Sequence, residues 1–348
     1  MNPIFKSPLL LTLLLTVFFG CKNLPVVESK RTAKTFDGPP VSTTHPSLFP
    51  DDDTEDANVS TSEGSKGTTS SSTSPSPSTP STTTTSPTSG GRPSTIPSDP
   101  RIGVIVGSGF LRSYIAVGIL QELYRARIPI YGLVGFEWGS LPAALYSLNA
   151  QANEVEWQML KMSESSVLKK TLIRNQVESQ SIAELQDYLR STFNHHTFEQ
   201  SKISFECLSF DYKKKQFFWM KKGEIATALS YCLASPPFFK PYLNNVGAVD
   251  LKLAADTLRQ KGANYIVFID TLSSNNDLYD STFSPEAQVL WSLQQWQIMK
   301  TKNLVDFVID TNTASYSLIN FDSRRDMIRK GQEIGQQAVK KLSEKLKL

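Results

Sequence analysis

The stretch Ile102-Gly103-Val104-Ile105-Val106-Gly107-Ser108-Gly109 decides the fold of this chain. Its first five residues are apolar and mainly β-branched, which is typical of a buried strand, and the glycines that follow favour a tight loop. Apolar side chains then recur at the spacing of a helix that is buried on one face. The sequence therefore predicts a strand, a glycine loop and a helix in succession. The residues with the helical spacing are Ile115, Val117, Ile119, Leu120 and Leu123.

The same unit recurs directly afterwards. A second apolar run covers residues 128–134 and ends at Gly135-Phe136-Glu137-Trp138-Gly139, after which apolar residues again follow a helical pattern. Two strands that are each followed by a helix favour a parallel sheet with right-handed crossovers. The apolar residues of the second helix are Leu141, Ala143, Ala144, Leu145 and Leu148.

Four later segments extend the α/β pattern. The sequence predicts a helix over about residues 250–260, a buried strand over 265–270, a last strand over 305–309 and a C-terminal helix over about 322–346. The expected fold class is therefore α/β, with a central, mostly parallel sheet in a domain that covers residues 101–348.

Composition divides the chain into three parts. The chain has 348 residues, of which 39% are hydrophobic and 20% charged. Within the segment 22–100, residues 41–100 are dominated by Ser, Thr and Pro and show no apolar periodicity. Such a segment cannot bury enough surface to offset its chain entropy, so we expect a disordered linker. As a coil, its roughly 80 residues would have a reach of about 50 Å. We expect this linker to act as a tether.

Residues 1–21 have the features of an export signal. Lys6 precedes an apolar run over residues 9–19, which is too short to span a membrane, and the run ends at Gly20-Cys21. This ending resembles the bacterial lipobox, although Phe18 stands where that motif usually has Leu. The resemblance implies an acylated Cys21 and a chain held in the bacterial cell envelope, on the periplasmic side of the outer membrane. An ordinary signal peptide and an uncleaved anchor are the alternatives.

Charge and cysteine content exclude several other classes. The net charge is +3 without a long basic run, so we expect no nucleic-acid partner. Three Cys and three His without metal-ligand spacing argue against a metal site, and no motif calls for a cofactor. Cys207 and Cys232 could pair in an oxidising periplasm, but we expect two buried free thiols.

Two glycine motifs resemble those of the patatin-like phospholipase family. The family's oxyanion loop, G-G-G-x-x-R-G, is matched at Gly107, Gly109 and Arg112, with Ser108 between the glycines. Its nucleophile motif, G-T-S-x-G, falls on residues 135–139, where Gly135 and Gly139 are kept. The other matching segments are Gly118-Ile119-Leu120, residues 232–241 and residues 261–270.

The resemblance implies the three-layer fold of that family but not its Ser-Asp dyad. Glu137 occupies the nucleophile position, and Val246 occupies the position of the Asp in the family's D-G-G/A motif. Val246 cannot accept a proton, and a carboxylate at position 137 would repel a developing oxyanion. We therefore expect a patatin-like protein with no competent catalytic residues, which binds phospholipid, fatty acyl chains or an unknown protein partner.

The alternative is an acyl hydrolase, a phospholipase A or esterase, in which Glu137 acts as nucleophile or base. A second group would then have to activate water, for which Asp250 and the pair His195-His196 are candidates. Asp250 is more readily explained as a helix N-cap, and the histidines as part of a solvated loop. None of Ser108, Ser113 and Ser140 lies at the apex of the elbow, and we expect Ser140 to point into helix packing.

Aromatic residues surround the predicted site. They either line a pocket that holds an acyl chain or a partner's apolar segment, or they fill a collapsed pocket. A second group of aromatics in the family's variable region is expected to form a cap or a membrane-facing surface. The first group is Phe110, Phe136, Trp138, Phe238 and Phe239, and the second is Trp157, Phe217, Phe218 and Trp219.

Overall fold

The computed structural model describes residues 99–170, 177–273 and 283–348. The predicted signal segment 1–21 and almost all of the predicted linker 22–100 therefore lie outside the described residues. Among the described residues, no helix combines the length and the apolar character needed to cross a membrane.

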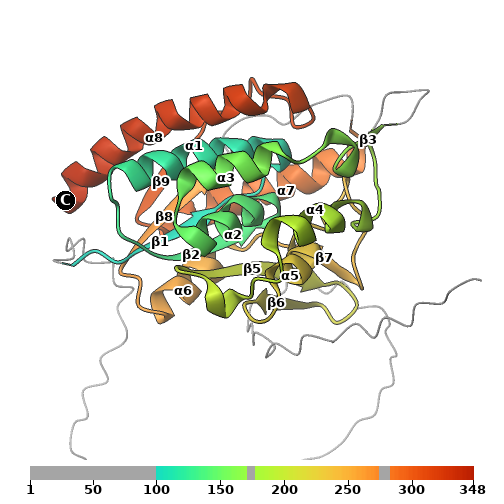
Figure 1. Ribbon diagram of the computed structural model, residues 1–348, viewed down its shortest axis with the longest axis horizontal. Coiled ribbons are helices and arrows are strands. Elements are labelled where there is room, and N and C mark those ends of the chain that lie inside the picture. The colour runs from blue at the N-terminus through green and yellow to red at the C-terminus, as the bar shows by residue number, and fades with distance from the viewer. Residues whose placement is uncertain (1–98, 171–176, 274–282) are drawn as a thin grey trace, which may run out of the picture. The chain divides into compact units, whose positions relative to one another are not determined.

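Strands and helices are interspersed along the chain (Figure 1). The strands are β1 (Ile102–Val106), β2 (Ile130–Phe136), β3 (Lys169–Lys170), β4 (Val177–Glu178), β5 (Ser204–Asp211), β6 (Gln216–Met220), β7 (Asn245–Gly247), β8 (Tyr265–Asp270) and β9 (Phe307–Asp310). The α-helices are α1 (Ser113–Arg125), α2 (Ser140–Asn149), α3 (Ala152–Leu160), α4 (Ala183–Phe193), α5 (Ile225–Cys232), α6 (Leu251–Gln260), α7 (Pro285–Thr301) and α8 (Arg324–Leu346). Short 3₁₀ turns include η1 (Phe110–Arg112) and η2 (Glu137–Gly139).

The central sheet has the strand order β6-β5-β2-β1-β8-β9, and β7 pairs with β5. The strands β5, β2, β1, β8 and β9 are parallel, whereas β6 and β7 run antiparallel to β5. The predicted fold class, α/β with a mostly parallel sheet, is thus confirmed. The central strand β1 is fully buried, as its continuous apolar run requires.

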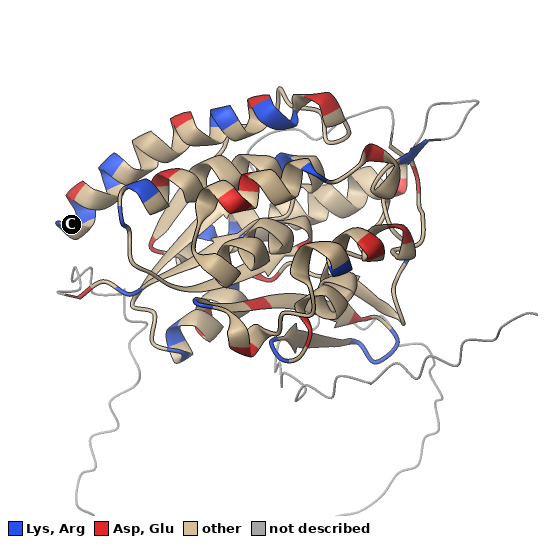
Figure 2. Ribbon diagram, in the orientation of Figure 1, with Lys and Arg blue, Asp and Glu red and all other residues tan. Residues whose placement is uncertain are grey.

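Helices cover both faces of this sheet. The steps from β1 to β2 and from β2 to β5 run in one direction along the sheet, and the step from β8 to β9 runs in the other. Right-handed crossovers therefore place α1 and α2 on one face and α7 on the other, where α7 contacts α6. The helix α8 packs on α1, and Figure 2 shows Lys, Arg, Asp and Glu at intervals along its length.

The elements that the sequence predicts agree closely with those observed. The carboxyl ends of β1 and β2 are in register, with Val106 opposite Gly135, so the glycine loop after β1 and the turn after β2 meet at one edge of the sheet. In open parallel sheets this edge is where ligands bind. The predicted glycine loop and elbow are both located there.

Candidate active site

The turn after β2 has the geometry of a nucleophile elbow. The strand passes through η2 directly into α2, and Glu137, the first residue of the turn, has a φ of +44°. For a residue with a side chain, this left-handed conformation costs about 1 to 2 kcal/mol. The backbone has therefore kept the sharp strand-to-helix turn that presents a nucleophile, although the side chain at its apex is a carboxyl group.

The elbow packs directly against the glycine loop. A methyl group on Gly139 would stand 2.1 Å from the carbonyl oxygen of Gly107, so only glycine allows the two backbones to approach this closely. The Thr271 hydroxyl fixes the same loop by donating to the carbonyl oxygens of Gly107 at 2.9 Å and Ser108 at 2.6 Å. The structure thus brings together the two motifs that the sequence places 28 residues apart, at Gly107 and Gly135.

Glu137 is buried and hydrogen-bonded. Its side chain is 6% exposed, and the amide Nε2 of Gln294 donates a 2.7 Å hydrogen bond to its Oε1. Burial raises the pKa of Glu137 to about 7, while the Gln294 amide and the nearby Ser235 hydroxyl oppose that rise. At neutral pH the group is therefore divided between a neutral acid and a carboxylate.

The strand β7 lies beside Glu137. It contains Val246, the residue at the family's acid position. A methyl group on Gly247 would stand 3.0 Å from the Cγ of Glu137, and Val246 is half-buried opposite Phe210. Asp250 does not fill the vacant role, because its Oδ1 accepts a 2.8 Å hydrogen bond from the backbone of Leu253 at the start of α6. The predicted N-cap role of Asp250 is confirmed.

One backbone amide of the glycine loop is already hydrogen-bonded and is not available to an oxyanion. The Gly107 amide already donates to the carbonyl oxygen of Ile269 at 2.9 Å. Phe110, which directly follows the last glycine of the loop, takes a φ of +48°, so the loop holds a left-handed position at a conformational cost. Arg112 is buried, and its Nε donates a 2.9 Å hydrogen bond to the carbonyl oxygen of Tyr316. Arg112 therefore stabilises the position of the loop.

Aromatic rings fill the space in front of the elbow. Phe110 stacks on Phe238 with 3.4 Å between ring centroids, and Trp138 meets Phe110 edge-on at 4.6 Å. The remaining cavity, about 10 Å³, is the space that a single water needs. Within the described residues, Glu137 is the one ionisable side chain that lines it. The other lining residues are Gly109, Phe110, Trp138, Ser235, Pro236, Phe238, Leu272, Trp291 and Leu318.

The other candidate residues do not join the site. Ser113 and Ser140 are fully buried, and neither lines the cavity. His195 lies in an exposed loop, where its Nδ1 contacts the carboxylate of Glu224. Among the described residues, no three His, Cys, Asp or Glu side chains are grouped so that they could hold a metal ion.

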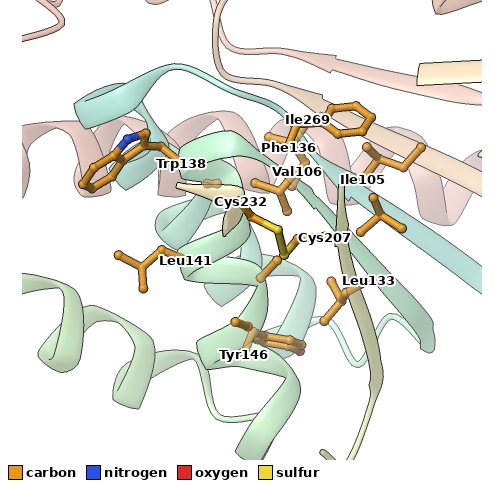
Figure 3. Close-up of a cluster of buried hydrophobic side chains, with 14 of the residues drawn as sticks. Ile105, Val106, Leu133, Phe136, Trp138, Leu141, Tyr146, Cys207, Cys232 and Ile269 are labelled. Atoms are coloured by element: carbon orange, nitrogen blue, oxygen red, sulfur yellow. A yellow bond between two sulfur atoms is a disulfide. The ribbon is translucent and has the colours of Figure 1, made fainter. Parts of the chain in front are cut away.

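The expectation of two buried free thiols is wrong. Cys207 on β5 and Cys232 on α5 form a disulfide, with 6.2 Å between their Cα atoms. Figure 3 shows this bond within the buried apolar cluster that also contains Phe136 and Leu141. The sequence could not show that β5 and α5 pack against each other, and this packing brings the two sulfurs within bonding distance.

Sequence reasoning missed Gln294 and Ser235 as parts of the site. Gln294 lies on α7, 157 residues after Glu137 in the chain. Ser235 is 3% exposed, and its hydroxyl lacks a well-formed hydrogen bond to the described part of the chain. Ser235 lies in a segment that matches the family, so its place near the elbow could have been found, whereas no local signal points to Gln294.

The match to a protein family agrees with these motifs. Residues 104–266 match the family described as "Patatin-like phospholipase". Uncharacterised NTE family proteins of Mycobacterium bovis and Mycobacterium tuberculosis are 24% identical over 165 residues, which cover 46% of this chain and 43% of theirs. The chain thus spans less than half the length of these relatives. The solved structure of VipD from Legionella pneumophila has a TM-score of 0.41 and 10% identity, over 70% of this chain and 67% of that one.

Proposed function

This chain carries a patatin-like phospholipase domain, and we propose that it is a catalytically inactive member of the family. In this proposal the protein is lipid-anchored and acts as a lipid-binding module. One observation carries the proposal: a buried glutamate held by Gln294 stands at the apex of the elbow, where the family has its serine. Loss of both members of a dyad leaves only the assistance of binding and oxyanion stabilisation. The aromatic filling of the cavity further limits access of an ester to Glu137.

The test of inactivity uses the full chain. We expect no hydrolysis of phospholipid or of short-chain esters above a control without protein, and no labelling by a fluorophosphonate probe, because no hydroxyl stands at the elbow apex. The matched control is Glu137→Gln, which keeps the shape of the side chain and should behave like the wild type. Turnover that Glu137→Gln abolishes would overturn the proposal in favour of carboxylate catalysis.

Attachment to the membrane is proposed to occur through an acylated Cys21, on the periplasmic side of an outer membrane. The disulfide supports this assignment, because disulfides persist in oxidising compartments and are rare in the cytosol. Of the three cysteines in the chain, Cys207 and Cys232 pair, which leaves Cys21 at the end of the lipobox-like motif.

We expect Cys21→Ser to move the protein from the membrane fraction to the soluble fraction, because the substitution removes the acyl chains that hold it. The measurement is fractionation of cells that express either form. The control is Ser113→Ala, which leaves Cys21 unchanged and should remain with the membrane. An unchanged distribution of Cys21→Ser would show that the N-terminal segment acts as an uncleaved anchor or that Cys21 is incidental.

A further inference from the structure

The outer side of α7 is an exposed apolar surface. Five large apolar side chains on this helix are between 37% and 59% exposed, and no charged residue occurs from residue 287 to residue 299. A contiguous apolar surface on a soluble domain marks a site of interaction. We call it the α7 apolar face, and it consists of Val289, Leu290, Leu293, Trp296 and Met299.

The inner side of α7 is already fixed to the domain. Trp291 and Ile298 are buried in the core, and Gln295 donates a 3.1 Å hydrogen bond to the carbonyl oxygen of Ser273. Gln294 holds Glu137 from the same helix. The helix therefore cannot rotate to bury its outer residues without breaking these contacts. A helix that keeps large apolar side chains exposed on its outer side, in addition to those buried on its inner side, has apolar surface that a second neighbour can cover.

The charges next to the face favour a lipid bilayer as that neighbour. From residue 287 to residue 305 the only charged residues are Lys300 and Lys302, and no acidic residue occurs between Glu286 and Asp306. The Lys300 ammonium lies 5.9 Å from the centre of the Trp296 ring. Apolar residues and Trp on one face, with lysines at its end, are characteristic of helices that lie in a membrane interface with anionic lipids.

From this arrangement we propose that the α7 apolar face lies on a lipid bilayer, with Val289, Leu293 and Trp296 entering the boundary between headgroups and acyl chains. The inference deepens the proposed lipid-binding function and rests on it. It places the lipid contact on the outside of α7, not in the cavity at Glu137, which rings fill. In the anchored protein the linker expected from the sequence, with a reach of about 50 Å, would let the domain settle on the same membrane.

The face can be tested in the full chain carrying Cys21→Ser, because Cys207 and Cys232 are paired and an introduced cysteine is then the reactive thiol. Leu293→Cys or Val289→Cys receives an environment-sensitive fluorophore. The protein is then mixed with vesicles of phosphatidylethanolamine and phosphatidylglycerol that carry brominated acyl chains. The matched control is Trp157→Cys, since Trp157 is 55% exposed on α3, which packs on α1 and α2.

We expect bromine to quench the probe at residues 289 and 293 about threefold and to leave the probe at residue 157 nearly unchanged, because only the former enter the bilayer. Adding Leu293→Glu and Trp296→Glu to Val289→Cys should abolish quenching at residue 289, while circular dichroism shows an intact fold. Unquenched probes on α7, equal quenching at residue 157, or crosslinking of Leu293→Cys between two copies without quenching would each overturn the proposal. The protein in this experiment lacks Cys21, so the result does not depend on the proposed acyl anchor. A failure of the α7 contact can therefore be distinguished from a failure of the anchoring, which is tested by fractionation.

Discussion

Glu137→Gln is expected to make the protein more stable than the wild type at pH 8 and about equally stable at pH 5. Burial raises the pKa of Glu137 from an ordinary value of 4.5 to about 7, so the folded chain holds a proton that the unfolded chain releases between these values. The stability that this group contributes is complete below pH 4.5 and is lost as the pH rises through 7. At 1.36 kcal/mol per pKa unit, the loss is about 3 kcal/mol.

Glutamine removes the titration and can still accept the hydrogen bond from the Gln294 amide. The measurement is the free energy of unfolding in urea at several pH values between 5 and 8, for wild type and variant. The matched control is Glu344→Gln, because Glu344 is an exposed carboxylate on α8 that remains in water on folding. A difference between wild type and Glu137→Gln that stays constant over this pH range would contradict the burial and protonation described for Glu137.

The parts of the site that could be predicted from sequence are those set by local backbone pattern. Apolar runs that end in Gly107 and Gly135 predicted two parallel strands, and parallel strands in register bring their carboxyl ends to one edge. The assignment of Glu137 and Val246 to the two positions of the dyad followed from the spacing of family motifs. The N-cap role of Asp250 followed from its place before an amphipathic run.

The remaining features depend on contacts between distant segments. Gln294 could not be linked to Glu137, because no periodicity specifies which helix covers the elbow. The second aromatic group did not form one exposed surface: Trp157 is exposed, whereas Trp219 is buried on β6. The exposed apolar surface lies on α7, where apolar residues on both sides of the helix remove the amphipathic pattern by which sequence reasoning detects helices. Cys207 and Cys232 belong to the same class, because their pairing depends on how α5 packs on β5.

Replacing both Cys207 and Cys232 by Ala, in the Cys21→Ser chain, is expected to lower the free energy of unfolding by about 3 kcal/mol. The disulfide closes a loop between residues 25 apart, and a loop of this size restricts the unfolded chain by roughly that free energy. The free energy of unfolding of a domain is about 5 to 15 kcal/mol, so a loss of this size should clearly lower the midpoint of the urea transition. Cys21→Ser alone is the control and should lose stability only when a reductant is added. Two outcomes would contradict the disulfide: two free thiols found by mass spectrometry in the unreduced Cys21→Ser protein, or a urea transition that the double substitution leaves unchanged. Either would show that the bond between β5 and α5 does not form in solution, and the disulfide would then no longer support an oxidising compartment.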